Sequence, residues 1–350
     1  MYKPLKYRLA VVPKVPKRAE YSSAYGSQHD YSYLKSCIRT IVERRNLLLD
    51  IDVLQEKAFF RKQKKYAGVL FIGISDAAKE FLQQTSDVDK YVWAFNQVDW
   101  INKPEIFDHT RIVFEQSTRE LAHKVGPFTD FYYLPLGFQE DRKTIDHQYQ
   151  EYDIVFNGTL DRSRRVTAQF HRKDLLSYIL QAGVTVINFN GRSNTEVEHN
   201  LLEDLKHYSN FQVVNCFGDV EHYRAGNYAL NVPFHEIGSK DDIAADWGMS
   251  HYERENGNWL IHWDIFRCIG AKSNMVTFDC RETRELGLND QSCHFYSTDP
   301  TDVEQMAREI VQIVKSGEKK SIPVSVWEQN SYRSRWIFML DKVAKKITEH

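Results

Sequence analysis

A glycine and three arginines close an apolar run near the middle of the chain. The segment contains, in order, Asp153–Asn157, Gly158, Thr159, Arg162, Arg164 and Arg165, and a helical pattern follows it. Glycine lets a backbone approach a ligand closely, and helix N-termini and guanidinium groups both bind phosphate. The order of these residues predicts a diphosphate-binding turn, with a basic turn that only caps a helix as the alternative. The spacing fits neither a GxGxxG nor a Walker motif, which disfavours a dinucleotide cofactor or ATP.

A second candidate site lies in the last third of the chain. Asp264 and Arg267 are three residues apart in a predicted helix over Ile261–Ala271, so their charges share one face. The helix leads into a predicted strand, Asn274–Asp279, and can aim these charges at a bound nucleotide. A surface ion pair is the alternative.

Acid and base groups follow two other predicted strands. Asp99 comes after Tyr91–Asn96, and a carboxylate there could deprotonate an acceptor hydroxyl as a general base. An aspartate that starts a turn or caps a helix is the alternative. His235 and Glu236 follow the strand Tyr228–Val232 and open a long polar stretch, a common place for site residues.

Polar and basic residues also follow the first predicted strand, Arg8–Val12. The candidates for an acceptor or cleft loop are Lys14, Lys17, Arg18, Ser27, His29 and Asp30. Residues 1–65 hold 15 Lys and Arg against 6 Asp and Glu, a local charge of +9 in a chain whose net charge is −2. This part of the chain could meet an anionic partner such as a nucleic-acid backbone, or it could be a solvated basic surface.

The elements that must position these residues alternate along the chain. Short apolar runs separated by helical patterns indicate βαβ units and mainly parallel sheets, in which ligands bind beyond the carboxyl ends of the strands. The expected organisation is an N-terminal Rossmann-like domain (1–138), a linker (139–152), a second Rossmann-like domain (153–322) and a C-terminal helical segment (323–350). That last helix, over Val324–Thr348, could cross back to the first domain.

Composition is that of a globular protein of two domains. The 350 residues are 42% hydrophobic and 27% charged, and no apolar run approaches the length of a membrane span. The five cysteines form no CxxC pair, which favours reduced thiols and a cytoplasmic protein. No leader pattern stands at the N-terminus.

These features together resemble a family. The strand, glycine and arginine-rich turn, the Leu134-Pro135-Leu136-Gly137 segment at the domain junction and the late helix before a strand resemble GT-B glycosyltransferases. Within that group the chain is most similar to the T-even phage DNA β-glucosyltransferases and related enzymes that modify hydroxymethylcytosine in DNA.

The resemblance implies roles for particular residues. A serine and two arginines hold the donor diphosphate in that family, and by position these roles fall on Thr159, Arg162 and Arg165. Asp99 is the carboxylate nearest to the position of the family's catalytic base. The family's ribose-binding glutamate corresponds to Arg267, with the acidic residue displaced to Asp264.

The resulting expectation is a glycosyltransferase that moves a sugar from a nucleotide diphosphate, expected to be a UDP-sugar, to a hydroxyl. Double-stranded DNA carrying a hydroxylated base is the expected acceptor, reached by base flipping. The alternatives are a GT-B enzyme that acts on a bacterial surface glycan and a non-catalytic protein that binds sugar nucleotides or nucleic acid. No cofactor, membrane or obligate protein partner is expected. Assistance by Mg²⁺ or Mn²⁺ stays open.

Overall fold

The computed structural model divides the chain into two compact units, which are described one at a time. The residues that the structure describes are 7–14, 31–94, 104–115, 125–138, 151–160, 172–191, 193–216, 220–232, 263–296 and 302–349. The N-terminal unit contains the chain up to Gln139 and also takes in Tyr332–His350. The C-terminal unit contains the described segments from residue 151 to Ser331.

The N-terminal unit is built on a parallel sheet of six strands with the order β2-β1-β3-β4-β5-β6. Its strands are β1 (Tyr7–Pro13), β2 (Leu49–Val53), β3 (Gly68–Ile72), β4 (Asp89–Ala94), β5 (Ile112–Glu115) and β6 (Asp130–Tyr133). All five neighbouring pairs are parallel. The inner strands are almost wholly apolar because helices cover both faces of the sheet, which leaves no solvated face for polar residues.

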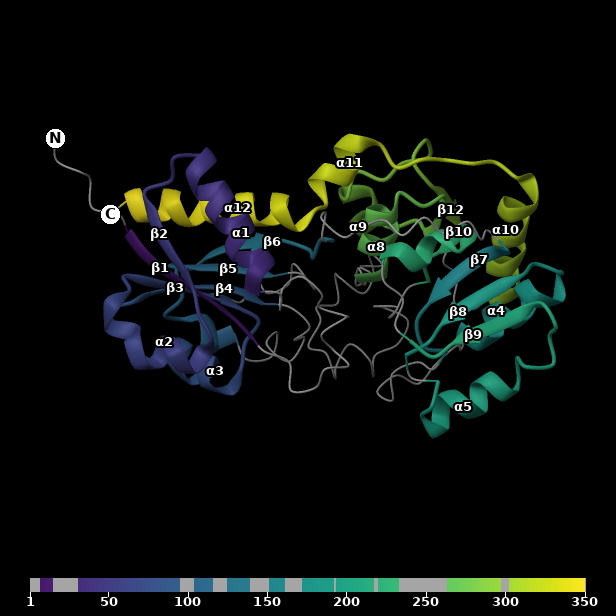
Figure 1. Cartoon of the computed structure of the whole chain (residues 1–350), viewed down its shortest axis with the longest axis horizontal. Helices are drawn as coiled ribbons and strands as arrows, with labels where there is room; N and C mark the ends of the chain where they lie inside the picture. Colours follow the sequence, from purple (N-terminus) through teal and green to yellow (C-terminus); the bar gives the residue numbers. More distant parts are fainter. Residues whose placement is uncertain are drawn as a thin grey trace. The chain divides into compact units, whose positions relative to one another are not determined.

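Helices cover the two faces of this sheet (Figure 1). Helices α1 (Tyr31–Arg44) and α12 (Tyr332–Thr348) lie on one face, and α2 (Glu56–Lys62) and α3 (Asp76–Gln83) lie on the other. On the first face Trp336 of α12 packs edge-on against Trp93 of β4, with ring centroids 6.3 Å apart. On the second face Phe59 contacts both Phe71 and Phe81. The last helix of the chain is therefore part of the N-terminal unit's core.

The C-terminal unit has a second parallel sheet, ordered β12-β11-β10-β7-β8-β9. Its strands are β7 (Tyr152–Asn157), β8 (Val186–Phe189), β9 (Phe211–Val214), β10 (Gly226–Leu230), β11 (Met275–Phe278) and β12 (His294–Tyr296). Read from β9 and numbered within the unit, this is the 3-2-1-4-5-6 order of doubly wound folds. The α/β class with parallel sheets that the sequence predicts is confirmed.

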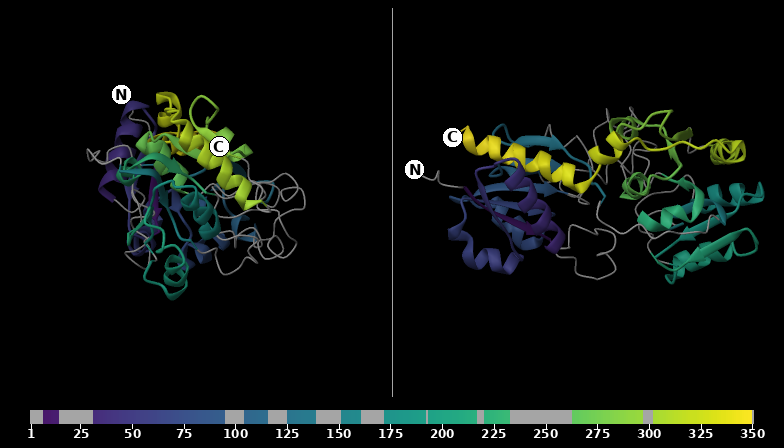
Figure 2. Two further views of the ribbon diagram at one scale, coloured as in Figure 1. Left: turned by 90° about the vertical axis from the view of Figure 1, so that its right-hand side faces the viewer. Right: turned by 45° about the horizontal axis from the view of Figure 1, so that its top comes forward.

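The helices of the C-terminal unit also lie on both faces of their sheet. The described helices are α4 (Arg172–Gln181), α5 (Glu196–Glu203), α8 (Trp263–Ala271), α9 (Arg281–Glu285), α10 (Val303–Ser316) and α11 (Val324–Gln329). A short 3-10 turn, η7 (Val220–Arg224), lies in this unit, and two others, η3 (Gln63–Lys65) and η5 (Pro104–Phe107), lie in the N-terminal unit. Helices α4 and α10 share one apolar cluster with the sheet, in which Leu175, Ile179 and Ile310 are fully buried. Figure 2 shows this unit from two further directions.

Two details of the sequence interpretation are wrong. The single helix expected over Val324–Thr348 is two helices, α11 and α12, separated at Asn330 and Ser331. The buried Asn330 side chain donates to the carbonyls of Leu286 and Val326, which fixes the break. Helices α2 and α9 were not expected, because each is too short to show a helical period. None of the described helices is long and apolar enough to cross a bilayer.

Candidate nucleotide-binding edge of the C-terminal unit

The chain reverses direction across the C-terminal sheet between β7 and β10, which are adjacent and parallel. From β7 the chain continues to β8 on one side, and from β10 it continues to β11 on the other. The crossover connections therefore diverge at this point, and doubly wound folds bind their ligands at such a switch point, beyond the carboxyl ends of the strands. The residues that follow Asn157 and Leu230 are the first candidates for a site.

The turn after β7 approaches a buried arginine closely. Gly158 has a φ of 140°, a conformation that side chains rarely adopt, and a Cβ there would lie 3.0 Å from Nη1 of Arg172. Arg172 donates from Nη1 to the carbonyl of Thr159 at 3.1 Å and from Nη2 to the carbonyl of Val232 at 3.3 Å. Its guanidinium thus joins the segments that follow β7 and β10, across the point where the chain reverses.

Arg172 is also the first described residue of α4. A cation at a helix N-terminus is unfavourable by itself, because that end of the helix carries a partial positive charge. A guanidinium beside the first turn of a helix suits an anion such as phosphate. The carboxylate of Glu198, which accepts the Leu160 N–H of the same turn, offsets part of that positive charge.

A buried carboxylate joins α8 to the end of β7. The Oδ1 atom of Asp264 accepts hydrogen bonds from Nδ2 of Asn157 (2.6 Å) and the hydroxyl of Tyr223 (3.0 Å) and pairs with Nη1 of Arg267 (3.4 Å). Asp264 and Arg267 are each 6% exposed, so the alternative interpretation, an ion pair on the surface, is wrong. Burial raises the pKa of Tyr223 well above its usual range, which keeps the hydroxyl protonated and donating.

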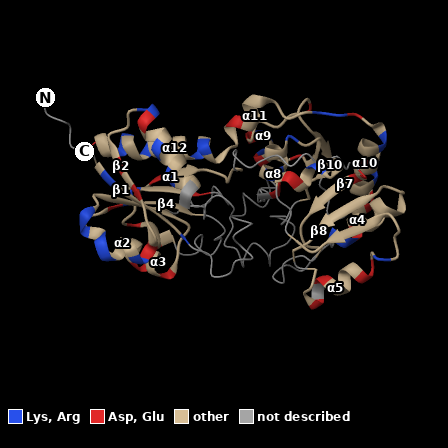
Figure 3. Ribbon diagram, in the orientation of Figure 1, with Lys and Arg blue, Asp and Glu red and all other residues tan. Residues whose placement is uncertain are grey.

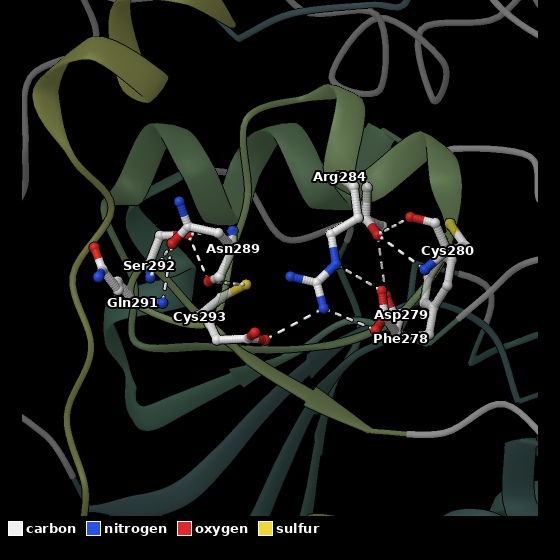
Figure 4. A network of polar contacts seen from close by, with 10 residues as sticks. Phe278, Asp279, Cys280, Arg284, Asn289, Gln291, Ser292 and Cys293 are labelled. Carbon is white, nitrogen blue, oxygen red and sulfur yellow. Dashed lines mark hydrogen bonds and ion pairs between the residues drawn. The ribbon is translucent and has the colours of Figure 1, made fainter.

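A second polar cluster lies beyond the end of β11 (Figure 4). Arg284 donates from Nε and Nη2 to the two carboxylate oxygens of Asp279 at 2.7 and 2.8 Å, and from Nη2 to Asp290 at 3.2 Å. The guanidinium also stacks on Phe295 at 3.8 Å. Arg284 holds the pKa of Asp279 below its usual range. The two carboxylates outnumber the one guanidinium, so the cluster fixes the loop after β11 and offers no net positive charge to a phosphate.

Only some of the sequence-predicted site residues lie in the described part of the chain. The structure brings Gly158, Thr159, Asp264 and Arg267 together around the end of β7. Lys14 lies in the other unit, beyond β1, where its Nζ donates to the carbonyl of Ile74 at 2.8 Å. Outside the described residues are Lys17, Arg18, Ser27, His29, Asp30, Asp99, Arg162, Arg165, His235 and Glu236.

Sequence reasoning missed three residues of this edge, namely Asn157, Arg172 and Tyr223. Asn157 was included only as the end of a strand. Arg172 carried a signal, because a basic residue in the first turn of a helix opposes the usual charge preference there. Tyr223 carried none, since it lies in a 3-10 turn far from Asp264 in the sequence. Among the described residues no group of three or more His, Cys, Asp or Glu side chains could hold a metal ion.

Comparisons by sequence find no relatives, as no family model matches the chain and no curated protein matches it. Solved structures are similar over the whole length. Sucrose-phosphate synthase from Thermosynechococcus elongatus superposes with a TM-score of 0.63 at 10% identity, over 99% of this chain and 100% of that one. HepE from Anabaena, in complex with UDP and glucose, gives a TM-score of 0.58 at 11% identity, over 98% and 100%. The chain has the GT-B fold.

A third GT-B structure is the lipopolysaccharide outer core galactosyltransferase WaaB, with a TM-score of 0.54 at 9% identity, over 96% of this chain and 98% of that one. The GT-B resemblance predicted from the glycine and arginine turn is thus confirmed at the level of the fold. None of these three proteins has a name that refers to DNA. The narrower part of the predicted resemblance, to DNA glucosyltransferases, therefore gains no support from them.

Proposed function

We propose that the protein is a glycosyltransferase that takes a sugar from a UDP-sugar bound at the carboxyl edge of the C-terminal sheet. The observation that carries this proposal is the Arg172 guanidinium, which joins the ends of β7 and β10 beside the N-terminus of α4. Doubly wound folds bind ligands in the crevice at such a switch point, where guanidinium groups and helix N-termini suit a nucleoside diphosphate. The UDP bound in the structure of HepE, which shares the GT-B fold, supports the same class of donor.

The roles of individual residues follow from this placement. Arg162 and Arg165, which follow Gly158 and Thr159 in the chain, would neutralise the leaving diphosphate as its negative charge develops. His235 and Glu236 come soon after β10 and would contact the donor from the other side of the crevice.

Asp264 and Arg267 would not contact the donor directly. The hydrogen bond from Asn157 to Asp264 ties α8 to the end of β7, and Arg267 pairs with Asp264 within the helix. They are therefore proposed to shape the nucleotide side of the site.

The proposed reaction is a direct displacement at the anomeric carbon of the donor sugar. The acceptor oxygen forms a bond to that carbon while the bond between the carbon and the diphosphate oxygen breaks, and UDP leaves with the electron pair. Asp99 is proposed to take the proton of the acceptor hydroxyl. Asp99→Asn should then slow transfer about 100- to 10,000-fold with little change in donor affinity.

The acceptor is a separate question, and a basic surface of the N-terminal unit bears on it (Figure 3). Five exposed cations lie within α2 and η3, namely Lys57, Arg61, Lys62, Lys64 and Lys65. Within the described part of the chain none of the five is in an ion pair. On other helices exposed cations pair with a glutamate four residues away, as Arg39 does with Glu43 and Arg308 with Glu304. This contrast favours an anionic acceptor or partner.

Two anionic acceptors fit that surface. A phosphorylated bacterial surface glycan is favoured by the similarity to WaaB, whose name refers to the lipopolysaccharide outer core. DNA containing 5-hydroxymethylcytosine is the second candidate, and the basic surface is the observation that favours it. For either acceptor, the basic residues Lys14, Lys17 and Arg18, which follow β1, are proposed to contact it as well.

One assay tests the donor, the acceptor and the metal together. The full chain is incubated with UDP-glucose, UDP-galactose or UDP-N-acetylglucosamine, and with either core oligosaccharides or hydroxymethylated duplex DNA. UDP release and mass spectrometry of the acceptor identify the product, and parallel samples contain Mg²⁺, Mn²⁺ or EDTA. Glycosylated nucleosides would establish the DNA acceptor, and a modified oligosaccharide would establish the glycan. Absence of UDP binding, together with absence of UDP release from every donor, would reject the glycosyltransferase.

A further inference from the structure

The turn that follows β7 is held by three buried side chains from three different elements. Asn188 of β8 donates from Nδ2 to the carbonyl of Gly158 at 3.1 Å, and Arg172 of α4 donates to the carbonyl of Thr159 at 3.1 Å. Glu198 of α5 accepts the backbone N–H of Leu160 at 2.9 Å. Three consecutive residues of one turn are therefore each fixed by a separate side chain.

Glu198 differs from the other two because it is a carboxylate with 2% exposure. Its Oε2 atom accepts the Leu160 N–H and also Nδ2 of Asn190 at 2.7 Å, just beyond the end of β8. Burial of a carboxylate costs free energy unless hydrogen bonds compensate it. Glu198 therefore holds together the chain segments that follow β7 and β8, at the same edge of the sheet as the proposed donor site.

The hydrogen bonds that fix this turn matter because its first residue is a glycine. Gly158 is free to adopt many backbone conformations, so the turn by itself would lose much conformational entropy on binding a ligand. Side chains that hold the turn in one conformation remove that cost before the ligand arrives, which raises affinity without a new contact.

We infer that Glu198 is a positioning residue of the donor site: it acts through the Leu160 N–H to preset the turn that receives the diphosphate. This inference rests on the proposed function. It assigns to α5 a role in donor binding, although Glu198 lies 38 residues after Leu160 in the sequence. The pattern Thr195-x-x-Glu198 is that of a capping box, and the Thr195 hydroxyl does accept the Glu198 N–H. The glutamate side chain, however, also reaches the turn.

The test compares four variants of the full chain by their dissociation constant for UDP, measured by calorimetry. Glu198→Ala frees the Leu160 N–H and should weaken UDP binding about 10- to 100-fold, the effect of losing a hydrogen bond to a charged group. Glu198→Gln keeps an oxygen that accepts the same N–H and should restore most of the affinity. Glu203→Ala removes an exposed glutamate of the same helix and should leave the affinity unchanged.

Leu202→Ala controls for stability. Leu202 is a buried core residue of α5 with 2% exposure, and its loss should lower the unfolding temperature at least as much as Glu198→Ala does. If Leu202→Ala keeps wild-type affinity for UDP while Glu198→Ala does not, the effect belongs to the turn. Where a UDP-sugar substrate has been identified, the loss should fall on KM for the donor, with kcat at saturating donor retained.

Two results would overturn the inference alone. One is wild-type UDP affinity in Glu198→Ala, and the other is an equal loss of affinity in Leu202→Ala. Failure of the wild-type chain to bind UDP would instead remove the proposed function and, with it, the inference that rests on it.

Discussion

At the scale of single residues, the buried ion pair between Asp264 and Arg267 is expected to contribute to the stability of the C-terminal unit. Asp264→Asn would leave Arg267 buried without its carboxylate, which should lower the free energy of unfolding of the C-terminal unit by about 3–5 kcal/mol. Urea denaturation measures the change. The double variant Asp264→Asn with Arg267→Met removes both charges and should recover much of the loss. A single variant as stable as the wild type would show that the pair carries no such energy.

His294 makes the stability of the C-terminal unit depend on pH. Its Nε2 lies 3.1 Å from the carbonyl of Glu318, and burial, followed by the charge of Lys320, lowers its pKa below the ordinary 6.5. The folded state then binds fewer protons than the unfolded state, so the stability is fully present above pH 6.5 and falls as the pH drops toward the folded-state pKa. The slope from this one group is at most about 1.4 kcal/mol per pH unit.

The check is a series of urea titrations between pH 7.5 and 5 on the wild type and on His294→Gln, whose amide can still donate to Glu318. The variant should show a shallower loss of stability in acid. Identical pH profiles for the two proteins would rule out His294 as the titrating group.

The glycine turn and the pair of Asp264 and Arg267 could be chosen as candidate site residues from the sequence, because each stands in a local pattern. The sequence could not reveal Tyr223 or Glu198, whose partners are 41 and 38 residues away. Contacts of this kind arise when parallel strands bring their carboxyl ends together, and no local period encodes them.

At the scale of elements, the break between α11 and α12 depends on one side chain. Asn330 is fully buried and donates from Nδ2 to the carbonyls of Leu286 and Val326, both at 2.8 Å. Asn330→Ala would leave the Leu286 carbonyl without this donor and should cost about 1–3 kcal/mol of unfolding free energy. Thermal unfolding followed by circular dichroism would measure it, with Glu328→Ala, an exposed neighbour in α11, as the control. Equal midpoints for the two variants would argue against this role.

The same break explains why the sequence predicted one helix where two exist. Apolar residues recur at helical spacing through both segments, so periodicity alone does not show an interruption. The strands were easier, because strands buried on both faces must be continuous apolar runs. The ends of the strands were harder to predict, as with β4, which was expected to begin at Tyr91 and begins at Asp89. Its expected last residue, Asn96, lies outside the described residues.

At the scale of the whole molecule, two units with separate cores should respond separately to change. Trp336 of α12 is 1% exposed in the core of the N-terminal unit, and Trp336→Ala should destabilise that unit by about 3–5 kcal/mol. UDP at 100 times its dissociation constant should stabilise the C-terminal unit by about 2.7 kcal/mol. Differential scanning calorimetry should show the first change in one transition and the second in the other. A shift of both transitions by either change would mean that the units unfold together.

The place of α12 in the N-terminal unit has a consequence for synthesis of the protein on the ribosome. Chains are made from the N-terminus at about 5–20 residues per second, and domains generally fold as units in that order. Here Trp336, Met339, Leu340 and Val343, which are buried in the first unit, are translated only after the entire second unit. The part of the N-terminal sheet that α12 covers, on the face that it shares with α1, must therefore stay uncovered until α12 has been translated. The second unit, although translated later, is the first whose core can be complete.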